Sequence, residues 1–563
     1  MASNSKPYHY TKHWIGQPRP VRIVVVGAGV SGIAAVKLYK EILGNLPVSL
    51  TLYDKNHDVG GTWLENRYPG CSCDIPAHNY TYSWEGNPNW SRMYVEAEEI
   101  FDYYKDRAQT YGVFEYVKLE HKVHEAVWND AKGKWVLRVE DLATGQMIED
   151  EAEVLINAGG FVNTWKWPDV SGLESFRGKL LHSAAWDNTV SFENKTVAVI
   201  GSGSSAIQIV PRIQKDVKHL FSINRSPTWI TPQYVVEHAP RNPGMRYTPE
   251  QQKKWAEDPE EFLRHRKEID AAITHGFRVN YRNSALQAEA YKASSQEMHA
   301  ILSKKEGLSE LLIPKFEVGC RRLTPGVGYL EALVEENVTV IGEGIEKFTA
   351  DSIVTQSGKD IKVDAVICAT GFDTSYRPPF NVRGKHGKEL RDVWADKPKS
   401  YLAVAVSGFP NYFTAIGPNF PVANGSLPYA VEAVIRYAFE AVRKIQRHNI
   451  KSLHPTPEAV EDFQQYKDSF MQDTVWTSDC RSWYKNGKPD GEVWGPWPGS
   501  ALHFRQSLDE PRWEDYEIEY WHSNRFEFLG DGSTEQEVSG GDTSYYLREP
   551  GGKVRGDTIR ARL

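Results

Sequence analysis

Two glycine motifs in this sequence have the spacing of nucleotide-binding loops. The first, after the β-branched run at residues 22–26, is Gly27-Ala28-Gly29-Val30-Ser31-Gly32. Its glycines allow a tight turn, close approach of a pyrophosphate to the backbone, and close packing of helix on strand. Asp54 ends the next apolar run, where a carboxylate can accept hydrogen bonds from both hydroxyls of an adenosine ribose. The first motif therefore predicts a site for FAD or NAD.

The second motif is Gly201-Ser202-Gly203-Ser204-Ser205-Ala206, after the apolar run at residues 197–200. The strand predicted next, at residues 219–224, ends at Arg225-Ser226 and not at an acidic residue. A guanidinium there matches the dianionic 2′-phosphate of NADP, which a carboxylate would repel. The alternatives are that Arg225 is a solvated surface arginine and that both loops merely turn the chain. FAD at the first motif and NADPH at the second predict a flavoprotein that a nicotinamide reduces.

The order of apolar runs predicts the fold class. We expect an α/β protein with two dinucleotide-binding, Rossmann-like domains, a helical insertion, and an FAD-binding domain that is discontinuous in sequence. The helical insertion opens with a capping box and a proline at Thr248-Pro249-Glu250-Gln251. The predicted ranges are 1–165 and 389–563 for the FAD-binding domain, the second ending in an aromatic cover, 166–235 and 316–388 for the NADP-binding domain, and 236–315 for the insertion.

Length and composition exclude several classes of protein. A chain of 563 residues is too long for one small module, and 40 % hydrophobic with 25 % charged residues is typical of a folded protein. The formal charge of −8 makes nucleic acid an unfavourable partner. No apolar window predicts a membrane span, and the first residues lack the apolar core of a secretion signal, so we expect an intracellular, cytoplasmic protein. A second interpretation is a peroxisomal address at Ala561-Arg562-Leu563.

The cysteines bear on redox chemistry and metal binding. There are five, at Cys71, Cys73, Cys320, Cys368 and Cys480. They are few, odd in number and scattered, which predicts reduced thiols and no disulfide framework. Cys71 and Cys73 have no His or Cys cluster to complete a metal site, so we expect no metal. A redox-active CxxxxC pair is missing near the first glycine motif, which disfavours a disulfide reductase.

Two segments between the glycine motifs resemble the two fingerprints of Baeyer–Villiger monooxygenases. Residues 60–74, GGTWLENRYPGCSCD, match GGxWxxxxYPGxxxD, and residues 176–187, FRGKLLHSAAWD, match FxGxxxHxxxWD. Trp186 holds the position where flavin monooxygenases and N-hydroxylases usually have Phe or Tyr. Residues 369–373 resemble another shared segment. The resemblance extends from about residue 20 to residue 490 and is closest to fungal-type members.

This resemblance implies a reaction and its catalytic residues. NADPH would reduce FAD, O2 would form a C4a-peroxyflavin, and this would attack a ketone to give an ester or lactone. Arg322 matches the family's catalytic arginine, and Asp74 matches the carboxylate that orients it; a loop cap is the alternative for Asp74. Arg321 either helps Arg225 to hold the 2′-phosphate or lies at the surface. In an extended segment, Arg321 and Arg322 would face opposite ways.

The remaining site residues follow from the motifs and from the resemblance. Thr62, Trp63 and Tyr80 are expected at FAD, with aromatic core packing as the alternative, and Trp483 resembles a loop residue that closes over NADP. His182 is either an acid–base group or, as we favour, part of a hinge between the nucleotide domains. The predicted cofactor-binding residues are Gly27, Ala28, Gly29, Ser31, Gly32, Asp54, Thr62, Trp63, Asp74, Tyr80, Gly201, Ser202, Gly203, Ser204, Ser205, Ala206, Arg225, Ser226, Arg321 and Trp483.

The sequence leaves the substrate less defined than the reaction. Many aromatic residues in the C-terminal part favour a bulky, hydrophobic ketone, cyclic ketones included. The main alternative is a flavin N- or S-hydroxylating monooxygenase, which does not require an arginine beside the reactive oxygen. The other is a non-catalytic nucleotide-sensing protein, which the presence of Asp74, Trp186 and Arg322 together disfavours. The predicted partners are a small-molecule ketone and O2, and the oligomeric state is not indicated.

Overall fold

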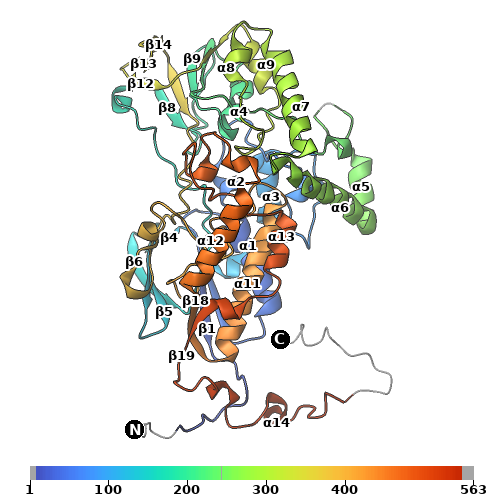
Figure 1. Ribbon diagram of the computed structural model, residues 1–563, viewed down its shortest axis with the longest axis vertical. Coiled ribbons are helices and arrows are strands. Elements are labelled where there is room, and N and C mark those ends of the chain that lie inside the picture. The colour runs from blue at the N-terminus through green and yellow to red at the C-terminus, as the bar shows by residue number, and fades with distance from the viewer. Residues whose placement is uncertain (1–7, 243, 548–563) are drawn as a thin grey trace.

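Two parallel sheets organise the chain in a computed structural model that describes residues 8–242 and 244–547. Elements of the second sheet lie in the upper half of Figure 1, and those of the first sheet lie in the lower half. Each sheet contains a strand that leads into one of the glycine motifs, as the sequence predicts. The tripeptide at residues 561–563 lies outside the described residues.

The first sheet contains five strands in the order β17-β7-β1-β2-β3, and all its pairings are parallel. Its central strand reads VRIVVV and is largely buried, as a β-branched run in the middle of a parallel sheet should be. Helix α1 follows the first glycine motif, and α11 packs on α1. The bounds are β1 (Val21–Val26), β2 (Val48–Tyr53), β3 (Val117–Lys118), β7 (Val154–Asn157), β17 (Tyr412–Thr414), α1 (Val30–Ile42), α2 (Thr62–Glu65), α3 (Ala97–Thr110) and α11 (Leu427–Arg447).

The second sheet repeats this pattern with the order β11-β10-β9-β15-β8, also parallel throughout. Helix α4 follows the second glycine motif and ends at Ile213, as predicted. Strand β10 ends at Ile223, so Arg225 lies just beyond the carboxyl end of the sheet. The bounds are β8 (Lys179–His182), β9 (Thr196–Ile200), β10 (His219–Ile223), β11 (Val338–Ile341), β15 (Ala365–Cys368), α4 (Ser204–Ile213) and α9 (Tyr329–Val334).

Three smaller sheets complete the described strands. Strand β16 lies inside range 316–388, which the sequence assigned to the NADP-binding domain, yet it pairs with β4 beside the first sheet. The chain therefore returns to the first half of the molecule before residue 388. The bounds are β4 (His121–Asn129), β5 (Lys134–Asp141), β6 (Gln146–Ala152) and β16 (Asn381–Arg383); β12 (Ile345–Phe348), β13 (Ser352–Thr355) and β14 (Asp360–Lys362); and β18 (Ile450–Pro455) with β19 (Tyr516–Tyr520).

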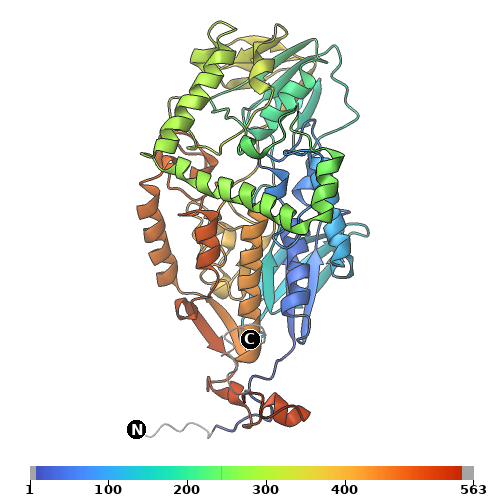
Figure 2. The ribbon, with the colours of Figure 1, turned by 90° about the vertical axis from the view of Figure 1, so that its right-hand side faces the viewer.

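The predicted helical insertion forms three long helices and one short one. Thr248 and Gln251 make the predicted capping box at the start of α5. Figure 2 shows α6 (Pro259–His275), in green, crossing the middle of the molecule, while α7 (Ala285–Leu302) lies in the upper half. They are therefore placed to wall a space between the two nucleotide-binding motifs. The bounds are α5 (Pro249–Glu257), α6 (Pro259–His275), α7 (Ala285–Leu302) and α8 (Leu308–Leu312).

The aromatic C-terminal part is largely packed coil and helix, as expected of a cover over the core. Trp476, Tyr484 and Trp497 are almost fully buried. The N-terminal arm pairs with the end of the chain, because Ile15 N donates to Ser533 O at 2.9 Å and Gly16 N to Phe528 O at 2.8 Å. The two segments lie together at the lower end of Figures 1 and 2. The bounds are α10 (Leu390–Val393), α12 (Pro457–Met471), α13 (Ala501–Ser507) and α14 (Glu535–Ser539).

Within the described ranges, every helix is too short or too polar to cross a bilayer.

Candidate functional site

A cavity of about 910 Å³ lies where the first fingerprint, the second glycine motif and the helical insertion meet. The segments that line it come from all three parts of the chain, including the fingerprint at residues 60–74 and the loop at residues 421–425. The predicted site residues that line it are Thr62, Trp63, Asp74, Tyr80, Gly203, Ser204, Ser205, Arg322 and Trp483. The fold therefore gathers residues more than 400 positions apart around one space.

Arg322 and Asp74 form a bidentate ion pair at the edge of this cavity. Arg322 Nη2 donates to Asp74 Oδ1 at 2.6 Å, and Nε donates to Oδ2 at 3.1 Å. Nη1 donates to the carbonyl oxygen of Val422 at 2.9 Å, which fixes the guanidinium from a third side. Two parallel bonds to one carboxylate hold the plane of the guanidinium as well as its position.

The fixed guanidinium still has donors to offer. A guanidinium carries five N–H groups, and three are used by Asp74 and Val422, so one remains on each terminal nitrogen. The Arg322 side chain is 37 % exposed, and it lines the cavity. The charge of Asp74 raises the pKa of Arg322 above its already high ordinary value. Arg322 therefore presents a permanent positive charge with a two-pronged donor, which suits an oxygen anion.

Arg321 points to a different part of the molecule, as the alternation argument predicts. Arg321 Nη1 donates to the carbonyl oxygen of Pro227 and to Thr228 Oγ1, both at 3.2 Å, and Nη2 donates to Ser226 Oγ at 3.3 Å. These partners follow directly on Arg225 beyond β10. The two adjacent arginines thus serve two separate places, one at the cavity and one at the end of the second sheet.

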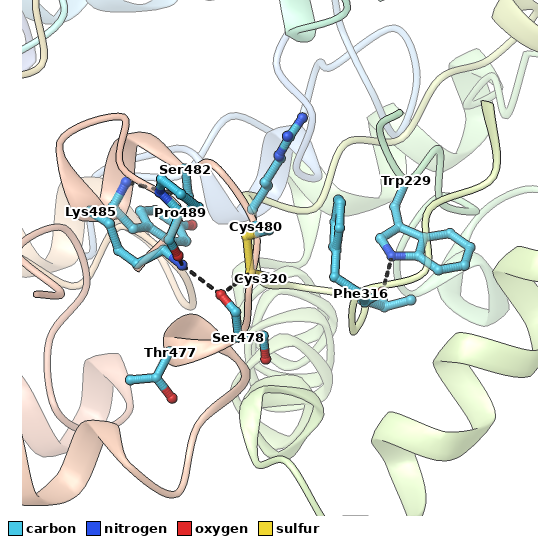
Figure 3. The surroundings of a disulfide bond; sticks show 12 residues. Trp229, Phe316, Cys320, Thr477, Ser478, Cys480, Ser482, Lys485 and Pro489 are labelled. Carbon is cyan, nitrogen blue, oxygen red and sulfur yellow. Dashed lines mark hydrogen bonds between the residues drawn. A yellow bond between two sulfur atoms is a disulfide. The ribbon is translucent and has the colours of Figure 1, made fainter. Parts of the chain in front are cut away.

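The prediction that all cysteines are reduced thiols is wrong for one pair. Cys320 and Cys480 form a disulfide across 160 residues, while Cys71, Cys73 and Cys368 are free and buried. Figure 3 shows that this bond joins the segment ahead of the arginine pair to the loop that carries Ser482 and Lys485. An odd count of scattered cysteines could not indicate this bond, because the fold alone brings the two Cα atoms within 6.4 Å. Among the described residues, no group of three or more His, Cys, Asp or Glu side chains could hold a metal ion.

The first glycine motif fits the diphosphate and ribose of FAD. Gly27 has φ +110°, and a Cβ there would lie 2.5 Å from the carbonyl oxygen of Ala158. A Cβ at Gly32 would lie 2.1 Å from the carbonyl oxygen of Gly27, so glycine is required for the close packing of α1. The carboxylate of Asp54 accepts from Ala28 N at 2.7 Å, which places it beside the loop. Burial raises the pKa of Asp54.

Two aromatic residues next to the cavity also fit a bound flavin. Trp63 and Tyr80 meet edge to face, with ring centroids 5.5 Å apart. The indole Nε1 of Trp63 is buried and has no hydrogen-bond partner within the described chain. A buried donor without a partner is costly, so its presence here points to an acceptor on a bound group. Thr62 lines the same wall at the start of α2.

The two glycines of the second motif differ in the space beside them: a side chain would clash with the protein at Gly201 but not at Gly203. Gly201 has φ +126°, and a Cβ there would lie 2.4 Å from the carbonyl oxygen of Ala369. A Cβ at Gly203 would meet no protein atom within 4 Å, so the space beside it is free for a pyrophosphate. Ser202 Oγ lies 3.1 Å from Thr228 Oγ1, which connects the loop to the partners of Arg321. The donors here suit the phosphates of NADP.

His182 lies away from the cavity wall, between the connections that join the two halves of the molecule. Its ring stacks on Trp165 with centroids 4.4 Å apart, and its Nε2 lies 3.3 Å from Thr370 Oγ1. Ala184 N donates to its Nδ1 at 3.1 Å, so the hydrogen of the neutral ring belongs on Nε2. Burial lowers the pKa of His182 to about 4. Trp186 packs on Phe192 nearby, with centroids 5.8 Å apart.

The sequence did not indicate several residues that complete the site. Gln208 of α4 reaches the first fingerprint, accepting from Tyr68 Oη at 2.9 Å and donating to the carbonyl oxygen of Ser72 at 3.0 Å. Tyr234 also lines the cavity with Arg322. Val422 contributes only a carbonyl oxygen. A backbone acceptor leaves no signal in side-chain types, and the others stand outside any motif.

Comparisons with known proteins agree with this geometry. A family model described as flavin-binding monooxygenase-like matches residues 20–243. The FAD-binding monooxygenase tazF of Aspergillus terreus is 38 % identical over 537 residues, which cover 94 % of this chain and 95 % of that protein. A Baeyer-Villiger monooxygenase of Pseudomonas aeruginosa is 32 % identical over 499 residues, covering 87 % and 90 %.

Solved structures give the same result. Cyclohexanone monooxygenase from Rhodococcus sp. Phi1 bound to NADP+ superposes with a TM-score of 0.75 and 26 % identity, covering 89 % of this chain and 100 % of that one. An oxidized steroid monooxygenase bound to NADP has a TM-score of 0.73 at 26 % identity. Three findings agree. The chain has a nucleotide motif on each of two parallel sheets, it contains both fingerprints, and its relatives match it over most of their length. The chain belongs to the FAD-dependent, NADPH-using monooxygenases of Baeyer–Villiger type.

Proposed function

We propose that this protein inserts an oxygen atom beside the carbonyl of a bulky, hydrophobic ketone, with Arg322 as the catalytic cation and Asp74 as its positioning partner. The observation that carries the proposal is the bidentate pair at 2.6 and 3.1 Å, which leaves donors of Arg322 free at the wall of the cavity. FAD, once reduced by NADPH, would activate O2 and supply the inserted atom.

The guanidinium would act on the charge that develops during oxygen transfer. Its two remaining N–H groups are placed to donate to an anionic oxygen and to the carbonyl oxygen of the substrate. Asp74 and the carbonyl of Val422 hold the group rigidly, so little reorganisation is needed when charge appears. Because arginine stays protonated, no proton has to leave Arg322 during turnover.

The cofactor residues have separate roles in the proposal. The loop at residues 27–32 and Asp54 would bind the adenosine and pyrophosphate of FAD, and Trp63 would donate its indole N–H to the flavin. The loop at residues 201–206 would bind the pyrophosphate of NADP, and Arg225, Ser226 and Arg321 would bind its 2′-phosphate. Trp483, whose ring lies 5.3 Å from that of Phe161, would cover the nicotinamide side of the cavity.

The shape of the cavity supports a bulky substrate. On the side of the helical insertion, its wall carries small residues: Ala272 of α6, Gly276 directly after α6, and Ala290 and Ala293 of α7. Small side chains at helical spacing leave room for a large apolar ring system near Arg322. Ile273 and Val279 add apolar surface, which favours a hydrophobic substrate over a charged one.

The proposal is tested by NADPH consumption against a panel of linear, monocyclic and fused-ring ketones, with product masses measured. We expect products heavier by one oxygen atom, and faster turnover for the larger ketones. Arg322→Ala should lower ketone oxidation by about 10²–10³-fold, as for loss of one oxyanion donor. NADPH oxidation that yields only hydrogen peroxide with every ketone would contradict the proposal.

The same variant separates ketone oxidation from sulfide oxidation. Arg322→Ala should lose ester or lactone formation while it still oxidises sulfides, because attack on a soft nucleophile does not need a persistent cation beside the reacting oxygen. Equal loss, or equal retention, of both activities would remove Arg322 from the catalytic role.

A further inference from the structure

The loop that follows Cys480 presents its side chains in different directions. Trp483 lines the cavity, and Tyr484 is buried and meets the ring of Trp483 edge to face. Lys485 is also buried and donates from Nζ to the carbonyl oxygens of Ser478, at 2.5 Å, and Pro489 (Figure 3). These bonds close the loop on itself. Arg481, in contrast, is exposed.

The disulfide fixes where Arg481 lies. Cys480 directly precedes Arg481, and Cys320 directly precedes Arg321, so one covalent bond joins the two residues ahead of the two arginines. The Cα atoms of the cysteines are 6.4 Å apart. The guanidinium of Arg321 is further held over the ring of Phe316, 5.2 Å from its centroid. Arg481 therefore belongs to the surroundings of Arg321, although the two are 160 positions apart.

Three arginines gather here without a counter-ion. Burial and the charges of Arg225 and Arg481 lower the pKa of Arg321, and no carboxylate is among the groups that act on it. Among the described residues, none of the three arginines has an ion pair with Asp or Glu, and Arg225 and Arg481 have no hydrogen bond to the protein. Arg321 Nε is buried without a partner. Neighbouring positive charges repel one another, and an anion bound between them removes this repulsion.

The neighbouring groups indicate which anion. Ser226 and Thr228, the partners of Arg321, follow the strand whose end meets the adenosine ribose in a dinucleotide fold. Ser202 of the glycine loop lies within 3.1 Å of Thr228 Oγ1. The anion at this position in a family that uses NADP is the 2′-phosphate, which NAD lacks.

We propose that Arg481 is a third arginine ligand of the 2′-phosphate of NADP, beside Arg225 and Arg321, and that the Cys320–Cys480 disulfide is the positioning device that holds it there. This rests on the use of NADP and adds a residue from the C-terminal part of the chain to nucleotide recognition. The same loop carries Trp483 at the cavity, so it connects the 2′-phosphate site to the cavity wall.

The first test measures binding of NADP+ and of NAD+ to the FAD-loaded oxidised protein by titration calorimetry. Arg481→Ala should raise the Kd for NADP+ about tenfold, the loss of a charge-assisted hydrogen bond, and leave the Kd for NAD+ unchanged. Arg481→Lys should recover most of the loss. Arg525→Ala removes another exposed arginine and should change neither Kd. Equal changes for both nucleotides, or no change for NADP+, would overturn the role of Arg481.

The second test addresses the disulfide. Five cysteines with one bond leave three thiols, so thiol titration of the unfolded protein should count three before reduction and five after it. Reduction with dithiothreitol should raise the Kd for NADP+ in the parent protein and have little effect in Arg481→Ala. If the disulfide acts by positioning Arg481, breaking it has no further effect once that side chain is gone. Five thiols before reduction, or unchanged NADP+ binding after it, would overturn the positioning role.

Both tests are independent of the proposed oxidation. They read equilibrium binding and thiol counts, so a failure of ketone turnover leaves them interpretable. Conversely, if Arg481 does not bind the 2′-phosphate, ketone oxidation at saturating NADPH is still expected.

Discussion

At the scale of single residues, the site depends on a division of labour between Arg321 and Arg322. One guanidinium is held by Ser226 and Thr228, and the other by Asp74. The difference follows from the backbone, since neighbouring side chains of an extended segment point to opposite sides. Two adjacent cations can therefore serve a nucleotide phosphate and an oxygen anion without competing for either.

The role of Asp74 can be tested with a variant that keeps its shape. Asp74→Asn retains hydrogen-bond acceptance and removes the charge, so Arg322 loses its counter-ion in a half-buried site. We expect ketone oxidation to fall by about 10- to 100-fold and hydrogen peroxide release per NADPH to rise. Product and peroxide are measured together at saturating NADPH.

A matched pair elsewhere provides the control for Asp74. Asp150 binds Arg22 at 2.6 Å, and it is not among the residues that line the cavity. Asp150→Asn should lower the melting temperature and leave the ratio of product to peroxide unchanged. If Asp74→Asn changes only stability in the same way, Asp74 is a structural residue and not a positioning one.

At the scale of elements, the glycine loops are where the sequence is most informative. A continuous β-branched run, a tight turn and a helix are local features, so the strands β1 and β9 and the helix α4 follow from short stretches of sequence. Asp74, which closes the first fingerprint, and Arg322 were predicted as partners through resemblance, and the structure places them in contact.

The features that could not be predicted from the sequence depend on contacts between residues far apart in the chain. Cys320 and Cys480 are joined only because α12 and the loops around it return the chain to the segment at residues 316–323. Strand β16 joins β4 by three residues, too short a run to carry a signal of its own. The donor from Arg322 to Val422 uses a carbonyl that every residue possesses. None of these contacts is encoded by a pattern within a window of sequence.

The second loop offers a prediction that separates folding from nucleotide binding. Gly201→Ala places a Cβ 2.4 Å from the carbonyl oxygen of Ala369 at φ +126°, so the free energy of unfolding should fall by about 1–3 kcal/mol. Gly203→Ala meets no protein atom and has φ −88°, so stability should be retained. Its methyl group should nevertheless raise the Kd for NADP+, because it occupies the space beside the loop.

Denaturant unfolding and NADP+ titration of both variants check this prediction. The two glycines are two positions apart in one loop, which makes each the control for the other. Normal NADP+ binding by Gly203→Ala would mean that the pyrophosphate does not approach the loop there. Unchanged stability of Gly201→Ala would mean that the turn relaxes.

At the scale of the whole molecule, the two sheets are joined by connections that run side by side. Trp165 bridges to Phe372, and Asp373 N donates to the carbonyl oxygen of Thr164 at 2.7 Å. His182 contacts both connections, through Trp165 on one and Thr370 on the other. Gln208 adds a further link between the halves at the cavity. A relative motion of the two nucleotide domains would therefore change the contacts that His182 makes with these two connections.

This position makes stability depend on pH through His182. Its pKa is lowered by burial to about 4, against an ordinary value of 6.5, so between these values the unfolded chain binds a proton that the folded protein does not. The free energy of unfolding should then increase as the pH rises from about 4 to 6.5, and decrease again as the pH falls. This group contributes a slope of at most ~1.4 kcal/mol per pH unit. Protonation of Nδ1 would also abolish its bond from Ala184 N.

Urea unfolding from pH 4.5 to 7.5 measures this slope, and His182→Asn is the informative variant. Asparagine can accept from Ala184 N but is too short to reach Thr370, and it does not titrate, so the variant should be less stable at pH 7 and show a shallower dependence on pH. His57→Asn is the control, since His57 is exposed at the surface. An unchanged slope in His182→Asn would show that other buried histidines carry the pH dependence and that His182 joins the two connections by packing alone.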